Sequence, residues 1–241
     1  LGNFRMSGTV LLKYLGTESR VVVPEGITVI AQEAFAGNET IDRVLLPESL
    51  EEIGASAFRD CLLLQTISFP QSIKRIGEGA FEHCVKLIRA ILPQKLKKIE
   101  SNVFKHCQVL KEVQLGECLE EIGAMAFYGC CSLKEIFFPT SLTSIKEMAF
   151  YQCGSLKEIV LQKQVEFVGN LAFAQSGVRK VEVFSNGKNY GTGVFFGCTK
   201  LKYLTLGESV CHISDKFAYG CTSLKQVILP KSLQSVGRNV W

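Results

Sequence analysis

Residues 132–153 read SLKEIFFPTSLTSIKEMAFYQC, and this pattern returns every 23 residues along the chain. The six prolines share one position, or slot, of the repeating unit, and Phe195 continues the phenylalanine series one residue early. A fixed period of this length is typical of repeat architectures, in which one unit cannot bury its apolar face alone and neighbouring units stack. Phenylalanines mark the period at Phe35, Phe58, Phe81, Phe104, Phe127, Phe150 and Phe173.

The unit itself predicts three local structures. Ile136 and Phe138 alternate with Glu135 and Phe137, which is the period of a strand, and Pro139 then ends it. Residues 142–145 predict a second extended piece, and residues 147–152 predict one helical turn. Gly, Asp, His and Gln occupy the slot that ends this turn, and Gly, Asp and His are the residues that tolerate positive φ there. We therefore expect an α/β repeat solenoid with stacked parallel strands and about ten 23-residue coils.

The period also indicates the domain organisation. We expect an N-terminal cap at residues 1–23, in which 10–14 pair beside 20–23, and one continuous solenoid at 24–241 that stops midway through a unit and leaves an open terminus. The pattern is irregular at 162–193, where the proline slot holds Gln162 and then Phe184 and one residue is lost near Gly177. Residues 185–193 are expected to bulge from the rod, either as a functional loop or as an eroded repeat.

Composition limits the class of protein. Hydrophobic residues make up 47% and charged residues 21% of the 241 residues, which favours an extensive core and excludes disorder. The net charge of +4 is too small to indicate nucleic acid. No apolar run reaches the ~20 residues that a membrane-spanning helix needs, so this segment is expected to have no membrane span.

The repeat resembles the BspA-like leucine-rich-repeat family, whose units have the form L-x-x-I-x-L-P-x-S-L-x-x-I-G-x-x-A-F-x-x-C. The matching stretches include LKEIVL (156–161), LPESLEEIGASAF (46–58) and AFYGC (126–130), and the resemblance extends from about Gly8 to Trp241. It implies a right-handed leucine-rich-repeat superhelix. It also implies a protein of the surface of host-associated bacteria or parasitic protists that adheres to partners, and hence an extracellular or cell-surface location.

The cysteines follow the same period. Cys118, Cys131 and Cys211 lie outside the shared slot, and the other seven occupy it. A disulfide framework would use irregular spacings, so we expect reduced, buried fillers, with a redox role for Cys130 and Cys131 as the weaker alternative. The shared slot holds Cys61, Cys84, Cys107, Cys130, Cys153, Cys198 and Cys221.

Two histidine–cysteine pairs stand in neighbouring coils, His83 with Cys84 and His106 with Cys107. Zinc needs four converging donors, whereas the histidine slot faces outward and the cysteine slot faces the core. We therefore favour capping histidines over a zinc site and expect neither a metal nor another cofactor.

Catalytic motifs are missing from the sequence. There is no Walker loop, HExxH, GxSxG or GxGxxG, and the glycine cluster at 187–193 lacks the strand and helix of a phosphate loop. No nucleophile–base pair can be defended, so the chain is not expected to be an enzyme.

Outward-facing slots of the main strand are the candidate binding surface. An apolar row on a solvated face indicates an interaction surface, although strands favour such residues anywhere. The apolar members of this row are Val22, Leu45, Ile91, Phe137, Val160 and Ile228.

Beside that row, six consecutive coils carry a cation in one slot. We expect Glu112, Glu135 and Glu158 to neutralise the middle coils, which leaves a basic edge toward the C-terminus. This edge is either a solvated ladder that prevents aggregation or a site for an acidic partner such as a sialylated or sulfated glycan. Nucleic acid is excluded, because aromatic residues are not interleaved with the cations. The edge comprises Arg179, Lys180, Lys202 and Lys225, with Tyr203 beside it and Tyr190 in the irregular segment as further candidates.

Taken together, these features predict a monomeric, non-enzymatic recognition or adhesion module that binds a protein or glycan through its sheet face. An intracellular protein-binding scaffold is the alternative, and ten reduced cysteines fit it. A rod that positions a domain outside this chain is the third possibility.

Overall fold

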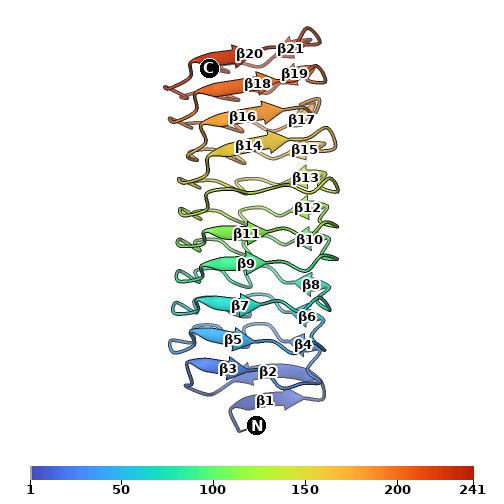
Figure 1. Ribbon diagram of the computed structural model, residues 1–241, viewed down its shortest axis with the longest axis vertical. Coiled ribbons are helices and arrows are strands. Elements are labelled where there is room, and N and C mark those ends of the chain that lie inside the picture. Colours follow the sequence, from blue (N-terminus) through green and yellow to red (C-terminus); the bar gives the residue numbers. More distant parts are fainter. Residues whose placement is uncertain (1) are drawn as a thin grey trace.

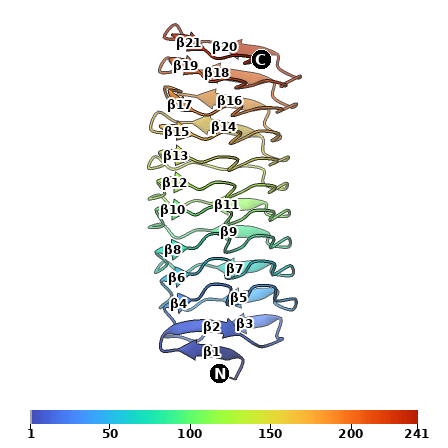
Figure 2. The same ribbon diagram turned by 180° about the vertical axis from the view of Figure 1, so that it is seen from behind.

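The computed structural model describes residues 2–241 and shows a rod of about ten stacked coils (Figure 1). The N-terminus lies at one end of the rod and the C-terminus at the other. Most coils carry a main strand and, after a turn, a shorter second strand. The second strands lie toward one edge of the rod, as both views show (Figure 2).

Main strands recur in the slots where the sequence alternates. They are three or four residues long, and their second residue points into the rod. In chain order they are β3 (Arg20–Val22), β5 (Arg43–Leu45), β7 (Thr66–Ser68), β9 (Arg89–Ile91), β11 (Glu112–Gln114), β14 (Glu158–Leu161), β16 (Lys180–Val183), β18 (Tyr203–Leu206) and β20 (Gln226–Ile228).

The second strands are two residues long and confirm the second extended piece. They are β4 (Val29–Ile30), β6 (Glu52–Ile53), β8 (Arg75–Ile76), β10 (Lys98–Ile99), β12 (Glu121–Ile122), β13 (Ser144–Ile145), β15 (Phe167–Val168), β17 (Asn189–Tyr190), β19 (His212–Ile213) and β21 (Ser235–Val236).

Strand register places identical slots of successive coils side by side. In the parallel pair β9–β11, Val113 lies opposite Ala90, and in β12–β13 Ile145 lies opposite Ile122. Each of these pairs is 23 residues apart in the sequence. The interior is therefore a set of columns of matched side chains, as the period predicted.

The central column is aromatic. Rings from Tyr14 through Phe35 and onward to Phe195 stack on one another with centroids 4.7–5.7 Å apart and interplanar angles of at most 27°. Offset stacking of this kind is favourable beyond the burial of apolar area. The column ends at Phe217, which meets Phe195 edge-on at 76° because the usual Ala-Phe order is inverted there. Trp241 is 48% exposed.

The helical part of the α/β prediction is wrong, because residues 2–241 contain no helix and the fold is a parallel-strand β-solenoid. In residues 148–152 every second N–H crosses to the next coil: Met148 donates to Asn170 and Phe150 donates to Ala172. In an α-helix these N–H groups would instead donate to carbonyl groups four residues earlier in the same segment. Met148 (φ 52°) and Gln152 (φ 59°) also lie in the left-handed region, which interrupts a helix.

Positive φ at the end of this turn was predicted correctly. All nine residues of the slot have it, from Gly37 (69°) through Asp60 (59°) to Gly220 (78°). A second left-handed slot lies four residues earlier, where Met148 and Leu171 stand, and the sequence did not reveal it because its residue types are mixed.

The N-terminal hairpin pairs differently from the prediction. β1 (Phe4–Ser7) and β2 (Val10–Tyr14) are antiparallel, and β2 then pairs in parallel with β4, so 10–14 do not lie beside 20–23 in a sheet. The five-residue strand β2 thus forms the N-terminal end of the sheet of second strands. The strand β3 belongs to the sheet of main strands, because it pairs with β5. The hairpin places the Tyr14 ring on Phe35 at the end of the aromatic column.

The expected bulge at 185–193 is also wrong. Asn189 and Tyr190 form β17 and pair in register with Phe167 and Val168. The lost residue is accommodated at Gly177, where an added Cβ would lie 2.0 Å from the carbonyl oxygen of Gly154. The shortened coil therefore approaches its neighbour closely there and the solenoid stays regular.

Candidate functional site

The main sheet opens at the coil of residues 135–138. β11 pairs only with β9, and β14 pairs only with β16, so the coil between them forms no strand. Within the described chain, the backbone groups of 135–138 have no hydrogen bond to either neighbouring coil. The strand that the alternation of residues 135–138 predicts is therefore absent from this coil. The first opening along the chain separates β7 from β9, so the opening at 135–138 is the second.

A bulky inward side chain accounts for both openings. The slot that follows the main strand holds Leu or Val in most coils, but it holds Phe69 next to the first opening and Phe138 at the second. Phe138 meets the rings of Phe150 and Phe173 edge-on, with centroids 5.8 and 6.4 Å away. Because a close-packed interior transmits added volume to its surroundings, we attribute the separation of the coils to these rings.

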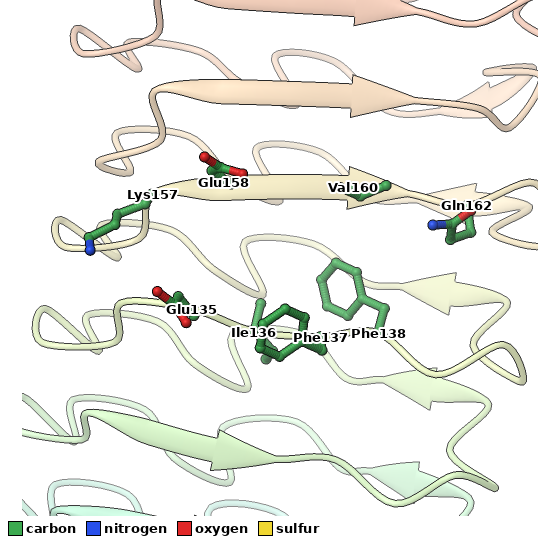
Figure 3. A pocket seen from close by; sticks show the side chains of 8 residues that line it. All are labelled: Glu135, Ile136, Phe137, Phe138, Lys157, Glu158, Val160 and Gln162. Atoms are coloured by element: carbon green, nitrogen blue, oxygen red, sulfur yellow. The ribbon is translucent and has the colours of Figure 1, made fainter.

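Two surface clefts flank Phe137 at this opening. One, of about 570 Å³, is lined by Ile136, Phe138 and Val160 together with charged residues (Figure 3). The other, of about 620 Å³, lies toward β11 and is lined by Val113 and Leu115 among others. Phe137 belongs to both clefts, and its side chain is 80% exposed.

Charged residues occupy one end of the first cleft. Lys157, Glu158 and Glu135 lie there, while Val160 and Gln162 lie toward the other end (Figure 3). The site thus combines an apolar ring that projects into solvent with charges at one side. Such a surface can hold an apolar group of a partner and orient it by polar contacts.

The predicted apolar row lies largely on the surface. Val22 (63%), Leu45 (48%) and Ile228 (48%) are exposed, and Ile91 (36%) lies at the first opening beside Phe69. Val160 is half-buried in the cleft beside Phe137. Phe137 and Val160 are two members of this row that line the same cleft. The inward side chain of Phe138 shapes this site, and that role was not predicted from the sequence. The available signal was a phenylalanine in a slot that holds leucine or valine in most coils.

The basic edge differs from the prediction in two respects. Lys180 has an acidic partner, because its Nζ lies 3.2 Å from Oε1 of Glu182. Glu112 pairs with Arg89 (3.3 Å) and so does not neutralise the cation that precedes it. Arg179, Lys225 and Tyr203 are exposed and Lys202 is half-buried. Positions in the sequence alone had suggested ion pairs that differ from those the side chains form in the structure.

Tyr190 is mostly buried. Its side chain is 9% exposed and fills the column that Val168 occupies in the preceding coil. Its hydroxyl is hydrogen-bonded to Ser185, which is also buried. The tyrosine is thus a core residue with a satisfied hydroxyl.

Histidines and cysteines of neighbouring coils point apart. The rings of His83 and His106 stack 5.0 Å apart at the surface, and His83 Nδ1 lies 3.0 Å from Asp60 Oδ1. Cys84 and Cys107 are fully buried and donate to backbone carbonyls. Burial, with a smaller effect of His83, lowers the pKa of His106. The four donors therefore do not converge.

One hydroxyl–imidazole pair was not foreseen. His212 Nδ1 lies 2.7 Å from Ser235 Oγ, because these residues face each other in the pair β19–β21. A nucleophile needs a base that a third group orients. In the part of the chain that the structure describes, no acidic group contacts this imidazole, so the pair lacks the arrangement of a catalytic site.

Comparison with known proteins agrees with this architecture. A family model described as BspA type Leucine rich repeat region matches residues 13–130 and 120–241. A leucine-rich repeat protein from Bacteroides ovatus is 26% identical, with a TM-score of 0.64 over 90% of this chain and 68% of that one. A leucine rich cell surface protein from Faecalibacterium prausnitzii is 20% identical, with a TM-score of 0.54 over 94% and 79% of the two chains. The curated proteins gave no match.

Proposed function

Because this chain belongs to the BspA-type leucine-rich-repeat family, we propose that it is a non-enzymatic recognition or adhesion module. Its main-sheet face binds a protein or glycan partner, and the surface around Phe137 is the centre of contact. Leucine-rich-repeat proteins typically act as interaction modules, and no catalytic family matches this chain.

The exposure of Phe137 carries this proposal. A phenylalanine that is 80% exposed leaves apolar area in water, whereas the phenylalanines of the central column are at most 2% exposed. Burial of an aromatic side chain contributes roughly 1.5–3 kcal/mol, and aromatic residues are enriched at the centres of interfaces. The two clefts beside Phe137 give a partner places to insert its own side chains.

Location is part of the proposal. We propose an extracellular or cell-surface protein, as the family resemblance implies. Among the structural neighbours, the Faecalibacterium prausnitzii protein is described as a cell surface protein. An intracellular scaffold is the second candidate, and the ten free cysteines favour it, because reducing compartments preserve thiols.

A binding screen tests the function. The purified chain is applied to arrays of host matrix proteins and of glycans, together with Phe137→Asp and Val160→Asp. Leu62→Asp is the matched control, since Leu62 is 45% exposed but lies in a turn outside the main sheet. Each cleft variant should raise Kd at least tenfold, about 1.4 kcal/mol, while the control binds like the parent chain.

Two results would contradict the proposal. Equal binding by Phe137→Asp and the parent would remove the role of the sheet face. Equal losses in Phe137→Asp and Leu62→Asp would indicate nonspecific apolar adhesion. Circular dichroism of all variants checks that the solenoid is intact.

Whether the cysteines are reduced in the native protein discriminates between the two locations. Protein isolated from its native source with all ten cysteines reduced and inside the cell would favour the scaffold. Protease-accessible protein on intact cells would support the surface location.

A further inference from the structure

Six consecutive coils carry a cation at the slot that precedes the main strand, and we call this set the cation row. From Lys134 onward the row is linked directly through the backbone. The N–H of Arg179 donates to Lys157 (2.7 Å), and the N–H of Lys225 donates to Lys202 (2.9 Å). Like charges therefore stand side by side along the rod axis. The cation row comprises Lys111, Lys134, Lys157, Arg179, Lys202 and Lys225.

Elsewhere the solenoid pairs opposite charges across neighbouring coils. Glu51 contacts Lys74 at 2.8 Å, and Glu120 contacts Lys97 at 3.0 Å, each pair from identical slots. Glu82 and Lys105 form another such pair at 3.0 Å. Coil stacking thus gives the chain a simple way to compensate a charge, namely an opposite charge 23 residues away.

The cation row departs from this arrangement. Among residues 2–241, no member of the row has a carboxylate within 4 Å. All members are exposed except Lys202, which is half-buried. Adjacent like charges repel one another, so the row raises the energy of the unbound rod. An anionic partner would remove that repulsion.

Spacing identifies the shape of the partner. Rings of the central column in the coils that carry Lys157, Arg179 and their neighbours are 5.1–5.3 Å apart, and the cations repeat with the same coils. The row therefore presents about one cation for each 5 Å of rod. An extended chain of pyranose units with an anionic group on each unit matches this line.

Sulfate has the properties that this line of cations requires. It stays ionised over the whole physiological pH range, and its oxygens accept charge-assisted hydrogen bonds from lysine and arginine. Glu112, Glu135 and Glu158 stand next to the first half of the row and would repel such a polymer. Contact should therefore be strongest at Arg179, Lys202 and Lys225.

We propose that the cation row binds a linear sulfated polysaccharide that lies along the rod axis, held mainly by Arg179, Lys202 and Lys225. The inference rests on the proposed function as a recognition module and assigns a partner class to one edge of the sheet face. Single-stranded nucleic acid is disfavoured, because its binding sites place stacking aromatic residues among the cations. Beside Arg179, Lys202 and Lys225 the adjoining exposed aromatic residue in the described chain is Tyr203 alone, and Phe137 lies beside the first half of the row, in clefts that Lys134 and Lys157 also line.

The test uses fluorescent dextran sulfate and the full chain. Binding is measured by anisotropy at several salt concentrations for the parent and for R179Q/K202Q/K225Q. The matched control is K95Q/K163Q/K231Q, which removes the same charge from exposed lysines in turns at the opposite end of the main strands. Neither variant should unfold at a lower urea concentration than the parent, because removing repulsion within the row can only stabilise the rod.

The row variant should raise Kd at least tenfold and flatten the dependence of log Kd on log salt, since fewer counterions are released. The control should change Kd less than threefold, and uncharged dextran should not bind. Equal losses of affinity in both variants would show that binding depends on net charge and not on the cation row. Equally tight binding of a single-stranded oligonucleotide would assign the row to nucleic acid instead, and no binding of dextran sulfate would overturn the proposal.

Phe137→Ala separates this inference from the proposed function, because it removes the ring without adding a charge beside Lys134 and Lys157. Dextran sulfate should bind this variant like the parent, whereas the array partner should bind it more weakly. If the array partner depends on Phe137 while dextran sulfate fails to bind, only the cation-row inference falls.

Discussion

The thiol of Cys107 donates a hydrogen bond to the carbonyl oxygen of Phe81 in the preceding coil, with 3.2 Å between the sulfur and the oxygen. The same carbonyl accepts the backbone N–H of Cys84, which closes the turn of its own coil. Cys130 repeats the bond to Phe104. Cysteine in this slot therefore fills space and also supplies a donor to a buried carbonyl, which alanine or valine could not do. Ser176 retains a hydroxyl in the same slot and lies 3.4 Å from the sulfur of Cys198.

Thiol reactivity should follow this arrangement. Burial raises the pKa of Cys61 to about 12 and likewise raises the pKa of Cys107. Because the thiolate is the reactive form, the buried ladder should not react with iodoacetamide at pH 8, whereas the exposed Cys118 and Cys131 should. Peptide mass spectrometry measures the modification. Guanidinium should expose all ten cysteines, and ladder peptides that react in the native protein as fast as Cys118 would contradict the buried column.

Truncation should reduce the stability of the protein strongly at Phe150 and hardly at all at Phe137. Phe150 is fully buried and stacks 5.1 Å from both Phe127 and Phe173, so Phe150→Ala should reduce the free energy of unfolding by about 3–5 kcal/mol. Phe137→Ala removes a side chain that is 80% exposed and should change it by less than about 0.5 kcal/mol. Urea unfolding of the two variants measures the difference. Similar midpoints for both would show that the aromatic column does not hold the coils together.

Gly177 is a second position where stability depends on the packing of coils. A Cβ there would lie 2.0 Å from Gly154 O, so Gly177→Ala should destabilise the protein by about 1–3 kcal/mol. Gly154→Ala is the matched control, because nothing lies within 4 Å of its added Cβ. This control should be neutral or stabilise by up to about 1 kcal/mol. Thermal unfolding ranks the variants, and a stable Gly177→Ala would argue against the close approach of the shortened coil.

The N-terminal hairpin should weaken at acid pH. The hydroxyl of Tyr14 donates to the Glu18 carboxylate; this bond lowers the pKa of Glu18, and Asn3 adds a further donor. Burial raises the pKa of Tyr14 to about 12, so its proton remains available as a donor at neutral pH. A carboxyl pKa that is lower in the folded state gives stability above the unfolded pKa of 4.5 and loses it as pH falls through the folded value.

Glu18→Gln should therefore have a smaller free energy of unfolding than the parent at pH 7. This difference between the two proteins should disappear at a pH below the ordinary pKa range of a carboxyl group. Hydrogen exchange of residues 4–14 between pH 3 and pH 7, corrected for intrinsic rates, follows the hairpin itself. Asp42→Asn serves as a control carboxyl. A parent–variant difference that grows as pH falls would have the wrong sign for this bond.

Much of the architecture could be predicted because each coil has neighbours with the same residues. The environment of Phe127 is set by Phe104 and Phe150, so one repeated unit fixes which slots are inside, and the cysteine column and the positive-φ slot followed from the same pattern. The outward position of Phe137 also followed from strand alternation. The period could not show which backbone N–H groups of a turn donate to carbonyl groups of the same turn and which donate to the next coil.

The sequence alone thus determined the period, the inward and outward slots and the repeat family. Only the tertiary structure decided that the predicted helical turn is replaced by bonds between coils, that β2 covers the second strands, and that the main sheet opens beside Phe138. It also decided that Lys180 pairs with Glu182 whereas the cation row stays unpaired. The physical reason is that these outcomes depend on contacts between coils. In a close-packed interior the volumes of individual side chains set those contacts, and a repeating pattern of residue types does not record them.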